Sequence, residues 1–280
     1  MVPPSREELT AILDLVAERR GVDFRDYRPP ALERGIVDRM ARTSCRTGAE
    51  YRLRVTEDPE EVGHLVAGLI VPVTGFFRDP AVFGALDRTV LPELARGARA
   101  RGLLRAWVAG AATGEEAWSV AMLMAEACRD GPGFEVIASD IDARSIVTAG
   151  AARYPREAAA MVPAPLRERY LTIEGAEAAI AEPLRRRVHF GQHDVMGHQL
   201  APLEAIVASF DLVCFRNVLI YFDLRLQRKA LERLLSELEP GGALVLGAVE
   251  TLPLALESAL EPYPGIAPAL RIFRRREDRR

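Results

Sequence analysis

The 280-residue sequence predicts an α/β protein in which a small N-terminal all-α domain precedes a doubly wound sheet domain, with a small antiparallel β-subdomain inserted in the latter. Two observations predict this fold class. Up to about Val71, apolar residues recur at helical spacing and no strand-like alternation occurs. From Arg101 onward, short apolar runs alternate with helical stretches, which is typical of βαβ units around a parallel sheet. We therefore expect domains at residues 1–72 and 73–280.

The N-terminal part carries helical periodicity and helix start signals. Helical stretches are predicted over residues 30–45 and 59–70. Asp58 is a suitable N-cap for the second of these, because Pro59 then takes the first helical position. An earlier helix is indicated by four apolar residues at helical spacing: Leu9, Ile12, Leu13 and Val16. Together these stretches predict a small helical bundle.

The second part alternates buried-type strands with helices. The turn Pro240-Gly241-Gly242 separates the last helix from the last strand of this series. Helices are predicted over residues 114–127, 143–152 and 223–238, and strands over residues 103–108, 134–138, 210–215 and 243–246. In a parallel sheet of this kind, ligands bind beyond the carboxyl ends of the strands.

One stretch interrupts this alternation. Short apolar runs at residues 170–173, 178–180 and 187–190 surround Glu174-Gly175, a turn sequence. Because they are too short and too close together for βαβ units, we expect a small antiparallel insertion over about residues 168–190.

Composition and charge exclude several classes of protein. A net charge of −3 gives no general attraction to nucleic acid or anionic lipid. No apolar run approaches the ~20 residues that a membrane-spanning helix needs, and the first residues lack the apolar core of a signal peptide. The three cysteines, Cys45, Cys128 and Cys214, have no paired spacing. We therefore expect reduced thiols and a cytoplasmic protein.

The first strand of the sheet domain ends in a loop of small residues, Gly110 to Gly114. Small residues allow the backbone to approach a ligand closely. Ala112 fills the second glycine position of the dinucleotide fingerprint, so that fingerprint is absent. Asp140, after the second strand, could accept hydrogen bonds from both hydroxyls of a ribose. Glu115 could bind an amino group such as that of S-adenosylmethionine; alternatively, it only complements the helix dipole together with Glu116.

Several uncommon motifs occur together. They are the loop that ends in Glu115-Glu116 and the segments at residues 74–80, 139–142, 214–223 and 240–242. Their order and spacing resemble the chemotaxis receptor methyltransferase (CheR) family from about Leu9 to Phe273. The resemblance implies a Rossmann-like methyltransferase domain that uses S-adenosylmethionine. It also implies an enzyme that esterifies glutamate side chains in the cytoplasmic domain of methyl-accepting chemoreceptors.

The resemblance also implies the site residues. Arg78 and Tyr221 fall where the family positions the substrate carboxylate near the methyl group. Cofactor-contacting positions fall on Thr74, Arg78, Glu115, Asp140, Asp194, Val195, Arg216 and Asn217. The family's usual Asn-Leu pair is replaced by Asp194-Val195, and its usual asparagine two residues before Thr74 is replaced by Pro72. Both changes bear on cofactor affinity more than on the fold.

The implied reaction needs few catalytic groups. A glutamate with a pKa near ~4.3 is already ionised at neutral pH, so no general base is required. Arg78 and Tyr221 suit the remaining task, which is to guide the carboxylate and to place a hydroxyl near the reacting centre. The alternatives are that Arg78 forms an ion pair, for example with Asp79, and that Tyr221 is a core aromatic residue beside Phe222.

The same resemblance bears on the expected binding partners and on metal ions. Arg34, Arg39, Arg42 and Arg46 recur near helical spacing and could form a basic face for an acidic receptor helix; the alternative is a solvated surface. We expect a monomer that binds no nucleic acid and does not insert into membranes. Methyl transfer needs no metal, and none is expected at the histidines of residues 189–198.

Two rival functions stay open. One is an S-adenosylmethionine enzyme that acts on a nucleic acid or a small molecule; Val218 and Leu219 stand where its Pro-Pro motif would follow Asn217. The other is a non-catalytic or divergent S-adenosylmethionine-binding signalling module. Pro72 and Asp194 are the departures that favour it.

Overall fold

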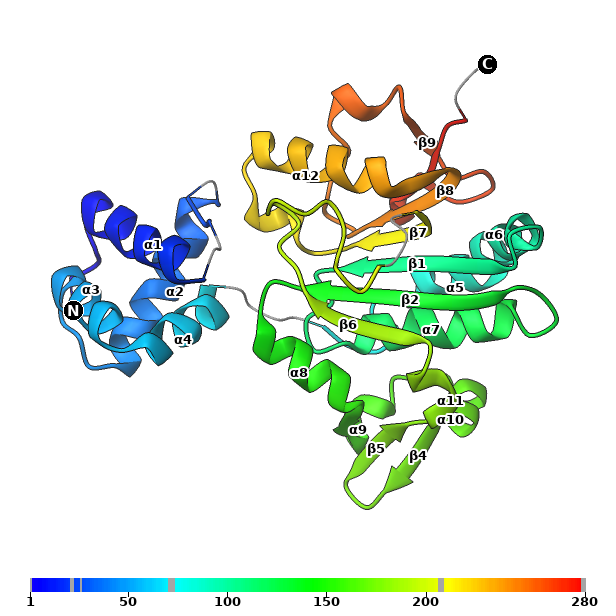
Figure 1. Ribbon diagram of the computed structural model, residues 1–280, viewed down its shortest axis with the longest axis horizontal. Helices are drawn as coiled ribbons and strands as arrows, with labels where there is room; N and C mark the ends of the chain where they lie inside the picture. Colours follow the sequence, from blue (N-terminus) through cyan, green and yellow to red (C-terminus); the bar gives the residue numbers. More distant parts are fainter. Residues whose placement is uncertain (1, 21–22, 26, 70–73, 206–208, 278–280) are drawn as a thin grey trace. The chain divides into compact units, whose positions relative to one another are not determined.

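A computed structural model describes residues 2–20, 23–25, 27–69, 74–205 and 209–277 (Figure 1). Contacts divide the chain into two compact units. The helical unit comprises Met1–Pro72 and Leu219–Gln227, and the sheet unit comprises Val73–Val218 and Arg228–Arg280. Pro72, which the sequence analysis singled out, lies outside the described residues. Within the described part, no helix is long and apolar enough to cross a bilayer.

Four helices build the core of the helical unit. Asp58 caps the last of them, since its Oδ1 accepts a hydrogen bond of 3.0 Å from the backbone N–H of Glu60. The apolar residues that predicted the first helix are buried, with Ile12 and Val16 fully enclosed. The helices are α1 (Arg6–Arg20), α2 (Pro29–Arg42), α3 (Gly48–Glu57) and α4 (Pro59–Leu69).

A buried ion pair joins α2 to α4. Arg39 donates to both carboxylate oxygens of Glu61, at 2.9 and 2.6 Å, and the Tyr51 hydroxyl donates to the same carboxylate at 2.8 Å. Burial acts to raise the pKa of Glu61, but the hydrogen bonds from Arg39 and Tyr51 outweigh it and hold the pKa below its usual value. Arg39 is therefore part of the packing between helices and does not belong to an exposed basic face.

The segment Leu219–Gln227 completes the helical unit. Tyr27 forms an isolated antiparallel bridge with Phe222, and their rings meet edge to face at 4.9 Å. The N–H of Arg28 donates to the carbonyl of Tyr221 at 2.9 Å. This segment holds the 3-10 turn η2 (Leu219–Tyr221) and the first residues of α12 (Leu224–Glu237).

A seven-stranded sheet forms the core of the sheet unit, in the order β6-β2-β1-β7-β8-β10-β9. The first five strands run parallel, and β10 is antiparallel to both of its neighbours. Every residue of β7 is buried, as expected for a strand covered on both faces. The strands are β1 (Leu103–Ala109), β2 (Gly133–Asp140), β6 (Val188–Gln192), β7 (Phe210–Phe215), β8 (Leu238–Leu246), β9 (Leu260–Pro262) and β10 (Ile272–Arg275).

Side chains of β1 alternate between two packed faces of the sheet. Leu104, Ala106 and Val108 join the cluster that includes the residues of α7. Trp107 points to the other face, where its ring lies 5.4 Å from that of Phe210. The helices of this unit are α5 (Pro80–Ala85), the π-helical turn η1 (Leu86–Val90), α6 (Leu91–Ala98), α7 (Glu115–Ala127) and α8 (Ala143–Ala151), with the short turns η3 (Leu254–Leu256) and η4 (Pro268–Leu270) near the C-terminus.

The fold class is confirmed, including the inserted antiparallel sheet. That sheet has the order β3-β5-β4, and its hairpin turns at Gly175. The first of its strands was not predicted, because a three-residue strand gives almost no periodic signal. The elements of the insertion are β3 (Arg153–Pro155), β4 (Leu171–Glu174), β5 (Glu177–Ile180), α9 (Arg156–Ala159), α10 (Ala164–Tyr170) and α11 (Glu182–Arg185).

Two local expectations were wrong. The run at residues 187–190 was assigned to the insertion, but Val188–Gln192 pairs in parallel with β2 and forms the edge of the large sheet. The segment Pro240-Gly241-Gly242 was expected as a turn before a strand. Instead it lies inside β8, next to a register shift between Phe210 and Leu212, and Gly241 takes a φ of +79° there.

Candidate functional site

The chain order of the sheet locates a ligand crevice. From β1 the chain proceeds to β2 and β6 on one side, and then returns to β7 and β8 on the other. The order therefore reverses between β1 and β7, and in open α/β sheets ligands bind at the carboxyl ends of the strands beside such a reversal (Figure 1). The residues that follow β1, β2, β6, β7 and β8 make up this edge, which we call the carboxyl edge.

The loop after β1 is tightly constrained. Gly110 and Gly114 have φ angles of +75° and +94°, and Ala112 also has a positive φ of +46°. A Cβ at Gly110 would lie 2.5 Å from the Val218 side chain, and a Cβ at Gly114 would lie 2.7 Å from that of Ala149. Both glycines are therefore required by conformation and by space, which explains the small residues of this loop.

Asp140 ends β2 inside the carboxyl edge and is 6% exposed. Its two oxygens accept hydrogen bonds from the backbone N–H groups of Ala112, at 2.8 Å, and Asp142, at 2.9 Å. Burial raises the pKa of this carboxyl group, although the two amides oppose the shift. Each oxygen still has a lone pair to offer, so the fixed carboxylate can accept bonds from a pair of neighbouring hydroxyls.

The chain after β6 is tied to the end of β2. The N–H of His193 donates to the carbonyl of Asp140 at 2.9 Å, which brings Asp194 and Val195 beside that residue. Asp194 accepts from the N–H of Met196 at 2.8 Å, and Val195 is buried. This segment supplies an acceptor and an apolar side chain next to Asp140.

Arg216, directly after β7, is buried between two carboxylates. Its Nη1 donates to Glu116 at 2.6 Å, and its Nη2 donates to Asp79 and to the backbone carbonyl of Arg78, at 3.2 Å to the latter. The guanidinium also lies over the ring of Phe83, at 5.6 Å from the ring centre. Its side chain is only 2% exposed, so the partners compensate a desolvated charge.

The segment that carries Arg78 has an unusual backbone. Phe77 and Asp79 both take left-handed conformations, with φ of +51° and +63°, which cost free energy in non-glycine residues. The N–H of Phe77 donates to Ser119 Oγ at 3.0 Å, while Ser119 itself donates to the carbonyl of Glu115 at 2.7 Å. Arg216 and Ser119 therefore hold both sides of Arg78 against the first turns of α7.

Further contacts link the segments of the carboxyl edge to one another. Tyr154, from β3 of the small sheet, donates to the carbonyl of Thr113 at 2.7 Å, and the Thr113 hydroxyl donates to Glu115 at 2.7 Å. After β8, Glu250 accepts from the N–H of Gly247 at 2.6 Å. A Cβ at Gly247 would lie 3.0 Å from the backbone N of Asn217, so the segments after β7 and β8 are in close contact.

The structure thus gathers most of the predicted cofactor residues at one edge. Six of them lie in linked segments there, and Arg78 is joined to these through its backbone carbonyl: Glu115 at the start of α7, Asp140 at the end of β2, and Asp194, Val195, Arg216 and Asn217 after their strands. Tyr221 belongs to the helical unit, where its carbonyl accepts from Arg28; Thr74 is the first described residue of its segment. The roles assigned to these residues, and the approach of Tyr221 to Arg78, stay predictions.

Sequence reasoning missed the residues that hold this edge in place. Glu116 was considered only as a complement to the helix dipole, and Ser119, Tyr154 and His193 were given no role in it. The only one of these residues that the local sequence could have indicated is Ser119, which stands one helical turn after Glu115. Among the described residues, no group of three or more His, Cys, Asp or Glu side chains could hold a metal ion.

The donors and acceptors at the carboxyl edge fit a nucleoside that bears an amino acid. Asp140 suits a ribose, Glu115 suits an ammonium group, and Val195 offers an apolar surface for a base. Nε of Arg216 is buried and has no hydrogen-bond partner among the described residues, which leaves a donor for a ligand. Such a molecule has no pyrophosphate, so its site does not need a run of free backbone amides to bind one.

Comparison with protein families agrees with this chemistry. Residues 7–70 match the family described as "CheR methyltransferase, all-alpha domain", and residues 72–264 match "CheR methyltransferase, SAM binding domain". The second match alone covers more than half of the chain.

Curated relatives include proteins of different lengths. An uncharacterized 104.1 kDa protein of Rhodobacter capsulatus is 34% identical over 88% of this chain and 26% of its own length. The "Probable biofilm formation methyltransferase WspC" of Pseudomonas aeruginosa is 34% identical over 93% of this chain and 60% of its own. "Chemotaxis protein methyltransferase 2" of the same organism is 29% identical over 88% and 87%. The chain therefore spans less than two thirds of the first two relatives.

Replacement of Arg216 by lysine tests the buried ion pair. Lysine keeps the charge but cannot bridge two carboxylates and a carbonyl with a planar fork. We expect Arg216→Lys to lower the free energy of unfolding by roughly 2–3 kcal/mol in urea denaturation. Arg228→Lys, which alters an exposed pair with Glu232, should change it by less than about 0.5 kcal/mol. Equal stability of the two variants would contradict the proposed importance of the bridge.

His193 should make stability depend on pH. Burial, reinforced by the charge of Arg233, lowers the pKa of His193 from 6.5 to about 4. The unfolded chain therefore takes up this proton first as the pH falls, so stability is present above about pH 6.5 and is lost toward pH 4. Between pH 7 and pH 5, the titration of this group should lower the free energy of unfolding by about 2 kcal/mol.

His193→Phe keeps a ring against Trp107, which lies 5.7 Å from the imidazole, but removes the titration. Its free energy of unfolding, measured in urea at several pH values, should fall about 2 kcal/mol less than that of the wild type between pH 7 and 5. His189→Phe, which alters a half-exposed histidine, is the control. A wild-type pH slope in His193→Phe would show that this histidine is not the group responsible.

Proposed function

Because the chain belongs to the CheR methyltransferase family and so uses S-adenosylmethionine, we propose that it methylates glutamate side chains of methyl-accepting chemoreceptors. Its products would be glutamate methyl esters made in chemosensory adaptation. The name "Chemotaxis protein methyltransferase 2" of a relative supports this acceptor. The described residues at the carboxyl edge support it as well, since none of them is arranged as a nucleophile with an adjacent general base.

The cofactor, when bound, supplies a methyl group on a positively charged sulfur. A glutamate oxygen guided by Arg78 would form the new bond to the methyl carbon while the carbon–sulfur bond breaks and its electron pair stays on sulfur. No proton moves, because the glutamate is already ionised. The tasks left to the protein are to align the three atoms and to exclude water, which stabilises the separated charges. Positioning of this kind can supply ~7–11 kcal/mol.

One observation carries the proposal: the backbone on both sides of Arg78 is fixed at the carboxyl edge. Arg216 binds the carbonyl of Arg78, and Ser119 binds the N–H of Phe77. A guanidinium on a fixed backbone suits a carboxylate, which it binds through two parallel hydrogen bonds. We propose that Arg78 guides the glutamate, and that Tyr221 supplies a hydroxyl from the segment that packs in the helical unit.

We further propose that the helical unit (residues 1–72 in the sequence prediction) recognises the receptor. Arg34, Arg42 and Arg46 are exposed, whereas Arg39 is engaged by Glu61. The remaining basic face is therefore smaller than the sequence predicts. An acidic coiled-coil flank in the cytoplasmic domain of a receptor would complement it, and a monomeric cytoplasmic enzyme would suffice for this encounter.

Transfer of a radiolabelled methyl group to receptor-containing membranes tests the proposal. The wild type should label the receptor band, and mild base should release the label as volatile methanol, as it does from methyl esters. Arg78→Ala should lower the rate at least ~100-fold, equivalent to about 2.7 kcal/mol of barrier. Arg78→Ala should still unfold in one cooperative transition, because the carbonyl at position 78 can still accept from Arg216.

Arg99→Ala, which removes an exposed arginine of the same unit, is the matched control and should keep full activity. Full activity in Arg78→Ala would refute the guiding role. Base-stable label would indicate a different acceptor atom. Cofactor binding by calorimetry with no transfer to any receptor would favour a divergent or non-catalytic S-adenosylmethionine-binding module.

A further inference from the structure

The outer edge of β6 is unpaired. In a parallel ladder, alternate residues direct their backbone groups to the neighbouring strand. The carbonyl of Arg187 accepts from Val136, and the N–H of His193 donates to Asp140, so the odd-numbered residues of this stretch face β2. The N–H and C=O groups of Val188 and Phe190 therefore point outward. They form no hydrogen bond with any other residue in the described ranges.

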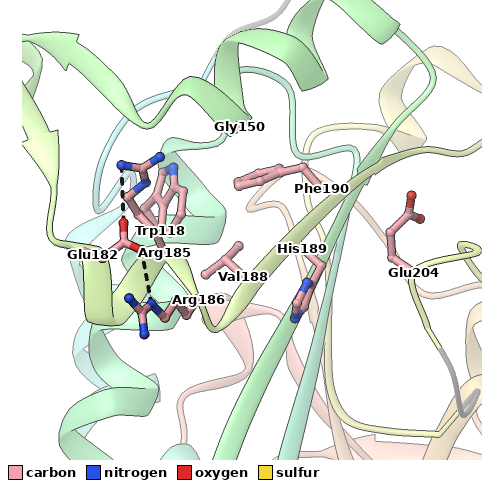
Figure 2. A pocket seen from close by; sticks show the side chains of 9 residues that line it. All are labelled: Trp118, Gly150, Glu182, Arg185, Arg186, Val188, His189, Phe190 and Glu204. Atoms are coloured by element: carbon pink, nitrogen blue, oxygen red, sulfur yellow. Dashed lines mark hydrogen bonds and ion pairs between the residues drawn. The ribbon is translucent and has the colours of Figure 1, made fainter.

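A groove of about 430 Å³ lies along this edge (Figure 2). Figure 2 shows Val188 and Phe190 on one side of β6, and His189 and Glu204 on the other. Successive side chains of a strand point to opposite faces of the sheet. Because residues from both faces line a single groove, the groove follows the edge of the strand.

The groove has an apolar wall on the side of α7 and α8. The rings of Trp118 and Phe190 meet at 5.3 Å, and Val188 packs beside them. Gly150 of α8 leaves this wall open, because a Cβ built there would have no atom within 4 Å. A protein that had only to cover its sheet edge could place a larger side chain at this position.

The opposite wall offers an unused acceptor. Oε2 of Glu204 is buried and has no hydrogen-bond partner among the described residues. A buried carboxylate oxygen without a donor costs free energy that a ligand hydroxyl or amide could recover. The carboxylate of Glu204 therefore marks a polar wall of the groove, beside Gly191 of β6.

The end of the groove next to α11 is basic. Arg185, Arg186 and Arg187 precede β6, and Glu182 is the only carboxylate on α11 to balance them, at 3.5 Å from Arg185 and 3.1 Å from Arg186. Arg186 is 76% exposed. The excess positive charge at this end is complementary to an acidic segment.

We propose that β6 binds an extended peptide segment as an additional strand of the large sheet. The segment alternates apolar residues, which enter the wall of Trp118 and Phe190, with hydroxyl residues that donate to Glu204. Acidic residues at its end pair with Arg185 and Arg186. Main-chain hydrogen bonds to Val188 and Phe190 give affinity, and the two walls give specificity. This site lies on the lateral edge of the sheet and is separate from the carboxyl edge.

The probe is a fluorescein-labelled peptide of sequence Glu-Glu-Val-Thr-Val-Thr-Val-Glu-Glu with blocked ends, whose acidic residues at both ends serve either strand direction. Fluorescence anisotropy with the full chain should give a dissociation constant of about 10–100 μM, the range for a small interface. The same peptide with lysine in place of glutamate should bind at least ~10-fold more weakly. Every second residue of the peptide directs its backbone N–H to β6. N-methylation of the backbone amides of that set of residues should therefore abolish binding, whereas N-methylation of the other set should not.

Gly150→Leu should weaken binding of the peptide at least ~10-fold, since the leucine side chain would enter empty space in the groove. Gly150→Ala is the matched control and should bind within about 2-fold of the wild type, with no loss of stability in a helix. Arg186→Glu, at an exposed position, should weaken binding ~5-fold or more without a change in folding. Methyl transfer to receptors should be unchanged in all three variants, so this test is independent of the proposed function.

Absence of saturable binding at about 1 mM peptide would overturn the proposal, because even weak interfaces saturate there. Equal affinity for the lysine peptide would also overturn it, and so would full affinity in Gly150→Leu. Sedimentation could instead show that the chain is a dimer on its own and that Gly150→Leu disrupts this dimer. That result would overturn the peptide proposal and assign the edge of β6 to a second copy of the chain.

Discussion

The buried guanidinium of Arg216 is the constraint on which the rest of the carboxyl edge depends. It lies between Glu116, at the start of α7, and Asp79, on the segment that carries Arg78. A charge taken out of water is tolerated only if its partners stay in place. The bridge therefore fixes α7, the end of β7 and the Arg78 segment as one assembly. It also stabilises two left-handed residues, Phe77 and Asp79, whose backbone would otherwise relax.

This constraint explains how a site with few chemical groups can be specific. The reaction of an ionised carboxylate needs alignment and a dry environment more than it needs proton transfer. In the proposed reaction, side chains that bind the backbone of the carboxyl edge would supply the alignment. Tyr154 and Ser119 do so with one hydrogen bond each, to the loop after β1 and to the N–H of Phe77. Asp140, the proposed ribose acceptor, is fixed by hydrogen bonds from two backbone amides.

Much of the fold could be predicted because β1, β2 and β7 are mostly buried strands separated by helices of regular period. β6 was misassigned because it follows closely on the β4–β5 hairpin: only the four-residue helix α11 separates it from β5, which is far shorter than an ordinary βαβ crossover. The position of Glu115 and Asp140 at the carboxyl edge could be expected, since the carboxyl ends of parallel strands meet there, while their roles toward the cofactor stay predictions. The partners of Arg216 were not, because they lie 100 and 137 residues away in the sequence and have no local pattern.

A structure of the chain with bound S-adenosylhomocysteine tests the central claim most directly. We predict that the Nη atoms of Arg216 keep Glu116 and Asp79 while the carboxylate oxygens of Asp140 lie about 3 Å from the two ribose hydroxyls. A guanidinium that leaves both carboxylates to bind the ligand, or a ligand bound away from Asp140, would contradict the account.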